Sequence, residues 1–252
     1  MYIMKKSYWK IVNSVIDKSD ILLLVLDARM PELTRNTEIE SKVKLRNKKI
    51  IYVLNKCDLV PKRLLEEHKK VFKPAVFVSS TQHFGTTILR NKILALAPKN
   101  DFKDIKVGVL GYPNTGKSSV INALKGKSSA KASSVSGYTH GVQMIRIDAK
   151  MMILDTPGVI PYGEDEEMKH VLIGTTNPSD LDDPELCAMQ VIDSFMEVIK
   201  QHYGVEGDDS EQILENIAKK KNKLAKGGVL DTLTTSKIIL KDWQKGKIKF
   251  LK

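Results

Sequence analysis

The chain has 252 residues, of which 42% are hydrophobic and 28% charged, a balance that predicts a folded protein with a substantial core and argues against extensive disorder. Its longest apolar run, residues 21–26, is far shorter than the roughly 18 residues that a membrane-spanning helix needs, and the N-terminus lacks the apolar core of a signal peptide. Two cysteines are too few for a disulfide framework, so we expect a soluble, cytoplasmic protein with no membrane partner.

Helical and strand patterns alternate from the N-terminus to about residue 154. Amphipathic periodicity predicts helices, and short continuous apolar runs predict buried strands. The expected helices span residues 3–16, 36–46, 61–72, 86–97 and 117–124. The expected strands span residues 21–26, 49–54, 75–78, 105–110, 142–148 and 151–154. This alternation predicts an α/β fold with a doubly wound, mostly parallel sheet.

The strand pattern ends near residue 162, and helices are expected at 184–202 and 210–223. We therefore predict two domains, an α/β domain over residues 1–165 and a small all-α domain over residues 166–252.

Positive charge is concentrated at the C-terminal end of the chain. Residues 216–252 contain 11 lysines, no arginine and two acidic residues, a net charge of +9 out of +11 for the whole chain. Such a segment is typical of a polyanion-binding appendage, although a solvated lysine-rich helix face is the simpler alternative. Lysine acts as a point charge on phosphate, which favours RNA backbone or shape recognition over base reading, and DNA is not expected.

Residues 111–118, GYPNTGKS, match the phosphate-binding pattern G-x-x-x-x-G-K-[ST] between an expected strand and an expected helix. The glycines let consecutive backbone N–H groups surround the phosphates, and the lysine reaches the β- and γ-phosphates. The phosphate contacts are assigned to Gly111, Asn114, Thr115, Gly116, Lys117, Ser118 and Ser119.

A magnesium site is expected beside this loop. The Ser118 hydroxyl is the usual Mg²⁺ ligand of such a loop, and Asp155, at the end of an apolar strand, begins the sequence DTPG, whose Gly158 is assigned to GTP binding. Thr139 is our choice for the switch threonine that closes on Mg²⁺ and γ-phosphate. Ser133, Ser134 and Ser136 are nearby alternatives.

The sequence NKCD at residues 55–58 predicts that the base is guanine. The Asp58 carboxylate would accept hydrogen bonds from the N1–H and 2-amino groups of guanine, which adenine lacks at these positions. Lys56 would lie along the ring face, Asn55 would hold the phosphate-binding loop, and Cys57 would fill a small buried space. Ser79 and Ser80 follow the next strand, where a backbone amide would contact guanine O6.

The order of these motifs is unusual, because the guanine-reading sequences precede the phosphate-binding loop. An ordinary GTPase has the reverse order, and a sheet tolerates the exchange because strand neighbours are kept while the covalent connections change. With the signature Asp27-Ala28-Arg29-Met30-Pro31, this arrangement resembles the circularly permuted GTPases of the YlqF/RbgA type. The Asp27–Pro31 segment itself is interpreted as a strand end and helix cap, with a catalytic role as the alternative.

The resemblance implies a GTPase that assists assembly of the large ribosomal subunit and binds rRNA through the basic C-terminal helices. The catalytic residues are assigned as Lys117, Thr139 and Asn114. Asn114 is included because it resembles the asparagine of K⁺-stimulated GTPases, and K⁺ dependence is left open. Val159 stands where Ras-like enzymes carry the water-orienting glutamine, so hydrolysis should be slow without a ribosomal partner. The alternatives are a regulatory GTPase with a protein target and a GTP-dependent RNA-binding module that hardly hydrolyses GTP.

Overall fold

The computed structural model describes residues 2–98, 104–126, 143–156, 167–174 and 176–250, without the side chains of residues 2–8, 167 and 168. The chain divides into two compact units. The first comprises Met1–Asp58 and Lys62–Glu164, and the second comprises Leu59–Pro61 and Asp165–Lys252.

The first unit alternates helices and strands. Its helices are α1 (Tyr2–Lys18), α2 (Thr37–Leu45), α3 (Lys62–Val71), α4 (Thr86–Leu96) and α5 (Lys117–Lys125). Its strands are β1 (Ile21–Asp27), β2 (Lys49–Asn55), β3 (Ala75–Val78), β4 (Ile105–Leu110), β5 (Gln143–Arg146) and β6 (Met151–Asp155). A short 3₁₀ helix, η1 (Cys57–Leu59), follows β2 and ends in the second unit.

The strands form one sheet in the order β3-β2-β1-β4-β6-β5. All neighbouring pairs are parallel except β5 and β6, which are antiparallel. The topology reverses between β1 and β4, because the chain runs outward from β1 to β3 and then returns to the other side of β1. This confirms the expected α/β fold with a mostly parallel sheet.

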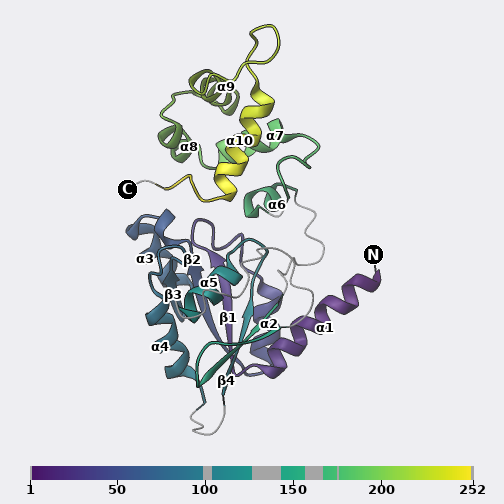
Figure 1. Ribbon diagram of the computed structural model, residues 1–252, viewed down its shortest axis with the longest axis vertical. Coiled ribbons are helices and arrows are strands. Elements are labelled where there is room, and N and C mark those ends of the chain that lie inside the picture. Colours follow the sequence, from purple (N-terminus) through teal and green to yellow (C-terminus); the bar gives the residue numbers. More distant parts are fainter. Residues whose placement is uncertain (1, 99–103, 127–142, 157–166, 175, 251–252) are drawn as a thin grey trace. The chain divides into compact units, whose positions relative to one another are not determined.

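Helices cover both faces of the sheet, and Figure 1 shows α1 and α4 on opposite sides of it. On one face, side chains of the central strands pack in a buried cluster with Leu89 and Ile93 of α4 and Val120 and Ile121 of α5. The other face contacts α1 and α2. Every residue of β1 is buried, which explains why its sequence, ILLLVLD, is apolar almost throughout rather than alternating.

A glycine in β4 determines how closely α1 approaches the sheet. A Cβ on Gly108 would lie 2.4 Å from Ser19 Oγ, 2.7 Å from a Leu22 methyl group and 2.8 Å from a Val15 methyl group. The Ser19 hydroxyl is fixed in this position, because it donates a hydrogen bond to the Val15 carbonyl at 2.6 Å. Only the smallest residue fits at this point of β4.

The second unit is helical. It contains α6 (Glu167–Ile173), α7 (Pro184–Ser194), α8 (Met196–Tyr203), α9 (Ser210–Lys220) and α10 (Thr232–Gln244). Helix α10 packs against α6, α7 and α9, and the Trp243 indole N–H donates to the Leu172 carbonyl at 2.8 Å. No helix among the described residues is long and apolar enough to cross a membrane.

Three of these helices begin with an aspartate whose carboxylate accepts a hydrogen bond from the backbone of the first turn. Asp183, Asp209 and Asp231 cap α7, α9 and α10, at N···O distances of 2.9, 2.8 and 2.9 Å. Such caps satisfy N–H groups that have no partner within the helix. The helical unit is thus marked in the sequence by its capping residues as well as by its apolar spacing.

Candidate nucleotide-binding site

The motif residues converge at the carboxyl edge of the parallel sheet. Asp27 pairs with Asn55 at the ends of β1 and β2, and Asn55 pairs with Val78 at the end of β3. On the other side of the topology switch, Asp155 ends β6 opposite Val109 of β4. Ligands of open α/β sheets bind at this edge, near the switch in strand order.

Asn55 joins the phosphate-binding loop to the loop after β3. Its buried amide nitrogen donates to the Thr115 carbonyl at 2.9 Å, across 60 residues of sequence, and its Oδ1 accepts from the Ser80 backbone N–H at 3.3 Å. The Ser80 amide is therefore used to hold Asn55. Ser79, one residue earlier, is buried, and its hydroxyl accepts from the Gln82 backbone N–H at 3.2 Å.

Gly116 makes this junction possible. It adopts a left-handed backbone conformation with φ of 90°, and a Cβ there would lie 2.2 Å from the Asn55 amide nitrogen. Gly116 is also the N-cap of α5 and supplies no side-chain hydrogen bond to the first turn of that helix. The first amides of α5 therefore have no side-chain cap, the arrangement in which helix N-termini bind phosphate.

The loop before Gly116 is held by its own polar groups. The buried Thr115 hydroxyl donates to the Tyr112 carbonyl at 2.9 Å. Lys117 is buried at the start of α5, and its ammonium donates to the Gly111 carbonyl at 3.1 Å and the Tyr112 carbonyl at 2.8 Å. Burial lowers the pKa of Lys117 to about 8, against the opposing charge of Asp155. Asn114 is exposed, with φ of 59°.

Asp155 has the environment of a metal ligand. It is buried, and its Oδ1 has no hydrogen-bond partner among the described residues. Burial raises the pKa of Asp155, and the nearby Lys117 charge opposes that rise. Ser118 is exposed at the N-terminus of α5 beside Ser119, which is also exposed. An unpaired carboxylate oxygen and a serine hydroxyl are the oxygen donors that Mg²⁺ prefers, so these residues fit the ion. Thr139 and Gly158, also assigned to this site, lie outside the described residues.

The predicted guanine-reading residues follow β2 directly. Lys56 has a left-handed conformation, with φ of 62°, and Cys57 and Asp58 begin η1. Cys57 is buried, and burial raises the pKa of its thiol to about 11, with a further contribution from the Asp58 charge. The cysteine is therefore an uncharged packing residue. Asp58, in contrast to the buried Cys57, is only half-buried.

The sequence did not reveal one connection, which runs from the Asp27–Pro31 segment to the predicted guanine-reading residues. Asp27 Oδ2 accepts from Lys56 Nζ at 2.7 Å and from Arg29 Nη2 at 2.8 Å. The segment was interpreted as a strand end and cap, and the Arg29 backbone N–H does donate to Asp27 Oδ1 at 3.0 Å. The contact with Lys56 spans 29 residues, so only the pairing of β1 with β2 brings it about.

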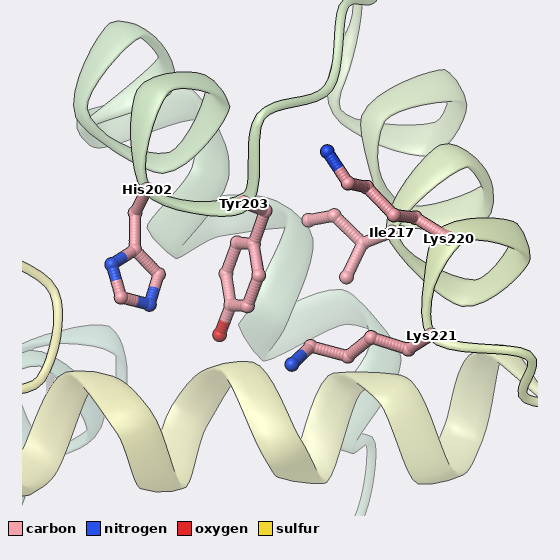
Figure 2. A pocket seen from close by; sticks show the side chains of 5 residues that line it. All are labelled: His202, Tyr203, Ile217, Lys220 and Lys221. Atoms are coloured by element: carbon pink, nitrogen blue, oxygen red, sulfur yellow. The ribbon is translucent and has the colours of Figure 1, made fainter.

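In the helical unit, a small pocket of about 190 Å³ is lined by His202, Tyr203, Ile217, Lys220 and Lys221 (Figure 2). Lys221 Nζ lies 5.0 Å from the centre of the Tyr203 ring, and Lys220 Nζ donates to the Gly204 carbonyl at 2.7 Å. The Tyr203 hydroxyl donates to Asp242 at 3.1 Å, and His202 packs edge-on against the Tyr203 ring. The cavity is a basic, aromatic feature at the end of α9, but its two ammonium groups already have partners within the unit.

The chain is similar to GTP-binding proteins of archaea, plants and bacteria. A family model described as a 50S ribosome-binding GTPase matches residues 106–226. An uncharacterized GTP-binding protein of Methanocaldococcus jannaschii is 43% identical over 249 residues, covering 96% of this chain and 66% of that protein. Nuclear/nucleolar GTPase 2 of Oryza sativa subsp. indica is 37% identical over 255 residues, covering 97% of this chain and 48% of that protein. The chain thus spans only part of the length of these curated relatives.

Two solved structures of YlqF share its fold. GDP-bound YlqF superposes with a TM-score of 0.67 at 26% identity, covering 94% of this chain and 95% of that chain. GNP-bound YlqF from T. maritima superposes with a TM-score of 0.65 at 25% identity, covering 94% and 93%. With the predicted guanine-reading residues before the phosphate-binding loop in sequence and beside it in the fold, the chain shares the fold and the permuted motif order of the circularly permuted GTPases of the YlqF type.

Proposed function

We propose that this protein binds GTP and GDP, hydrolyses GTP and acts in assembly of the large ribosomal subunit. The observation that carries the nucleotide part is the buried Asn55 side chain, which joins the β3 loop through Ser80 to the phosphate-binding loop through Thr115. A base-reading motif and a phosphate-binding motif joined in this way fit one guanine nucleotide between them.

Each site residue would have a distinct role in binding. The amides at the start of α5 and the Lys117 ammonium would hold the phosphates, with Lys117 exchanging its bonds to the Gly111 and Tyr112 carbonyls for phosphate oxygens. Asp58 would accept hydrogen bonds from guanine, and Lys56 would lie along its ring. Ser118 and Asp155 would hold Mg²⁺, which when bound neutralises charge on the β- and γ-phosphates.

Hydrolysis would be slow in the isolated protein. Val159 cannot orient water, because its side chain has neither a donor nor an acceptor. Thr139 would close over the γ-phosphate side, and Asn114 would help to bind K⁺, which would supply the positive charge that an arginine finger supplies elsewhere. We propose that the ribosomal subunit stimulates the reaction by completing this arrangement.

The ribosomal role rests on charge and on the family. Residues 216–252 carry a net charge of +9, and the family model that matches the chain is described as a 50S ribosome-binding GTPase. We propose that the lysines of α9, α10 and the segment between them contact phosphates of large-subunit rRNA. Nucleotide state would be coupled to this contact, so RNA affinity should differ between GDP and a non-hydrolysable GTP analogue.

The test begins with competition between guanine and adenine nucleotides. GTP and GDP should bind about 5- to 150-fold more tightly than ATP and ADP, because adenine would leave the Asp58 carboxylate without partners, at a cost of about 1–3 kcal/mol. An Asp58→Asn variant should lose that preference, whereas Glu67→Gln, at an exposed position of α3, should keep it. Equal affinity for ATP and GTP in the unmodified protein would refute the proposal.

Turnover then separates the assembly role from its alternatives. We expect the GTPase rate to rise when large ribosomal subunits are added, and we expect a further rise in K⁺ relative to Na⁺. A rate that is negligible with and without subunits would instead favour a GTP-dependent RNA-binding module. A high rate unaffected by subunits would favour a regulatory GTPase with a protein target.

A further inference from the structure

The end of β1 holds a buried carboxylate between two cations. Asp27 Oδ1 accepts from the Arg29 backbone N–H and from Arg29 Nε, both at 3.0 Å. Oδ2 accepts from Arg29 Nη2 at 2.8 Å and from Lys56 Nζ at 2.7 Å. The Asp27 and Arg29 side chains are 3% and 1% exposed, and that of Lys56 is 20% exposed. The described part of the chain shows no other carboxylate within ion-pair distance of Lys56.

A role as a turn cap explains only part of this geometry. The bond from the Arg29 backbone N–H is what a cap needs, and the Thr34 hydroxyl adds a second local bond by accepting from the Asp27 N–H at 3.0 Å. The bond to Lys56 contributes nothing to that turn, because Lys56 lies 29 residues later, at the end of the neighbouring strand. It does constrain the direction of the Lys56 side chain.

Arg29 makes the carboxylate an effective anchor. Burial alone would raise the pKa of Asp27, but the charges of Arg29 and Lys56 hold it well below its usual range, so the carboxylate is ionised throughout the physiological pH range. The two-pronged contact with the guanidinium fixes the plane of the carboxylate, which a single point charge would not do. Oδ2 is thereby presented to Lys56 in one orientation.

We propose that Asp27 and Arg29 are positioning residues for guanine binding, which hold the Lys56 side chain in the direction that places its alkyl chain against the ring face of the base. This inference rests on the proposed function, in which Lys56 belongs to the guanine-reading NKCD motif. It gives the Asp27–Arg29 pair a purpose in nucleotide affinity beyond the turn that it caps. Neither residue need touch the nucleotide.

The test is a double-mutant cycle with GDP as the probe. Asp27→Asn keeps the size of the side chain but removes the charge that holds Lys56, and Lys56→Met keeps most of the alkyl chain but removes the ammonium. Each variant should weaken GDP binding about tenfold, and the double variant should be no weaker than the weaker single variant, because both changes remove one shared interaction. The Asp27→Asn loss should be equal for GDP and inosine diphosphate, since the ring face does not involve the 2-amino group.

The matched control is another two-pronged ion pair of the same unit. Arg35 donates to Glu40 at 2.8 and 2.9 Å, so Glu40→Gln removes a comparable charge without altering the Asp27–Lys56 contact. It should leave GDP affinity within about twofold. If Asp27→Asn does not fold, Arg29→Lys replaces it. That variant keeps the charge but loses the two-pronged contact, and it should weaken GDP binding severalfold.

The outcomes separate this inference from the proposed function. Unmodified protein that does not prefer GDP to ADP would refute the proposed function itself. Normal guanine preference together with unchanged GDP affinity in Asp27→Asn, or in Arg29→Lys where that is the variant tested, would overturn only the positioning role. Fully additive losses in the double variant would do the same, because they would mean that Asp27 acts independently of Lys56.

Discussion

At the scale of single residues, the lowered pKa of Lys117 is a property that can be measured directly. It is buried beside Asp155, its ammonium bonds two carbonyls of its own loop, and burial lowers its pKa to about 8. Phosphate favours the protonated lysine, so a bound nucleotide must raise this pKa. Binding above pH 8 therefore requires the uptake of a proton.

We expect GDP affinity to be insensitive to the titration of Lys117 below about pH 7, where the lysine stays protonated, and to fall as pH rises through 8, with the dissociation constant increasing about tenfold between pH 7 and 9. Calorimetric titration across this interval measures the change. Lys117→Met should bind GDP more weakly and should show only the pH dependence of the nucleotide itself. Identical pH profiles for the two proteins would contradict the prediction.

The positions of site residues could be predicted from sequence wherever a contiguous motif specifies them. GYPNTGKS and NKCD indicated phosphate and guanine binding, and Asn55 was expected at the phosphate-binding loop because of its place in the second motif. The bond between Asp27 and Lys56 could not be predicted, since it depends on the register that sets Asp27 opposite Asn55. The use of the Ser80 amide by Asn55 depends in the same way on neighbouring strands.

At the scale of elements, the apolar runs in the sequence predicted the strands correctly. The predicted elements that differ from the structure do so because of tertiary packing. The helix expected over residues 184–202 is two helices, α7 and α8, separated at Phe195. That residue leaves the helical conformation, with φ of −139° and ψ of 37°, and its ring stacks on Trp243 at 4.5 Å and meets Phe250 at 5.6 Å. Local periodicity contains no information about such a contact between distant residues.

Two further elements show the same limit. Helix α10 was not assigned its own boundaries, because its sequence is rich in threonine and isoleucine and is stabilised largely by its contacts with α6, α7 and α9. The strand expected over residues 142–148 corresponds to β5, which ends at Arg146. The turn that follows is closed by Asp148, whose carboxylate accepts from the Lys150 backbone N–H at 2.7 Å.

Gly108 provides a test of how α1 packs on β4. We expect Gly108→Ala to destabilise the first unit by about 1–3 kcal/mol, because its methyl group would overlap Ser19, Leu22 and Val15. Urea unfolding in a Trp243→Phe background measures this, since Trp9 in α1 is then the only tryptophan.

The control for this experiment is Lys106→Ala, an exposed position two residues earlier in the same strand. It should change the unfolding free energy by less than about 0.5 kcal/mol. Equal stability of Gly108→Ala and the parent protein would mean that α1 shifts away from β4 without cost.

At the scale of the whole molecule, the circular permutation keeps spatial neighbours and changes only their order along the chain. The sheet order β3-β2-β1-β4-β6-β5 places the NKCD strand beside β1, and β1 beside the strand that leads into the phosphate-binding loop. One consequence is that the sequence after Asp155 leads directly to the lysine-rich second unit. Helices α6, α7 and α8 then lie between the candidate nucleotide site and the basic segment, residues 216–252, in chain order.

If residues 216–252 bind RNA through phosphates, the salt dependence of binding should reveal how many lysines take part. Each lysine that neutralises a phosphate contributes about 0.7–0.9 to the slope of log affinity against log salt concentration. Four exposed lysines of this segment form no ion pair with an acidic side chain among the described residues and are suitable for substitution by glutamine. They are Lys226, Lys241, Lys245 and Lys249.

Replacing all four with glutamine should lower the slope for large-subunit rRNA by up to about 3 and weaken binding most at low salt, while leaving GDP affinity unchanged. Filter binding across a salt series measures both effects. The control replaces four exposed lysines of the first unit, which changes the net charge equally. These are Lys44, Lys62, Lys70 and Lys73. Equal slopes for the two quadruple variants would mean that RNA responds to overall charge alone, because only a localised contact makes the position of the four lysines matter.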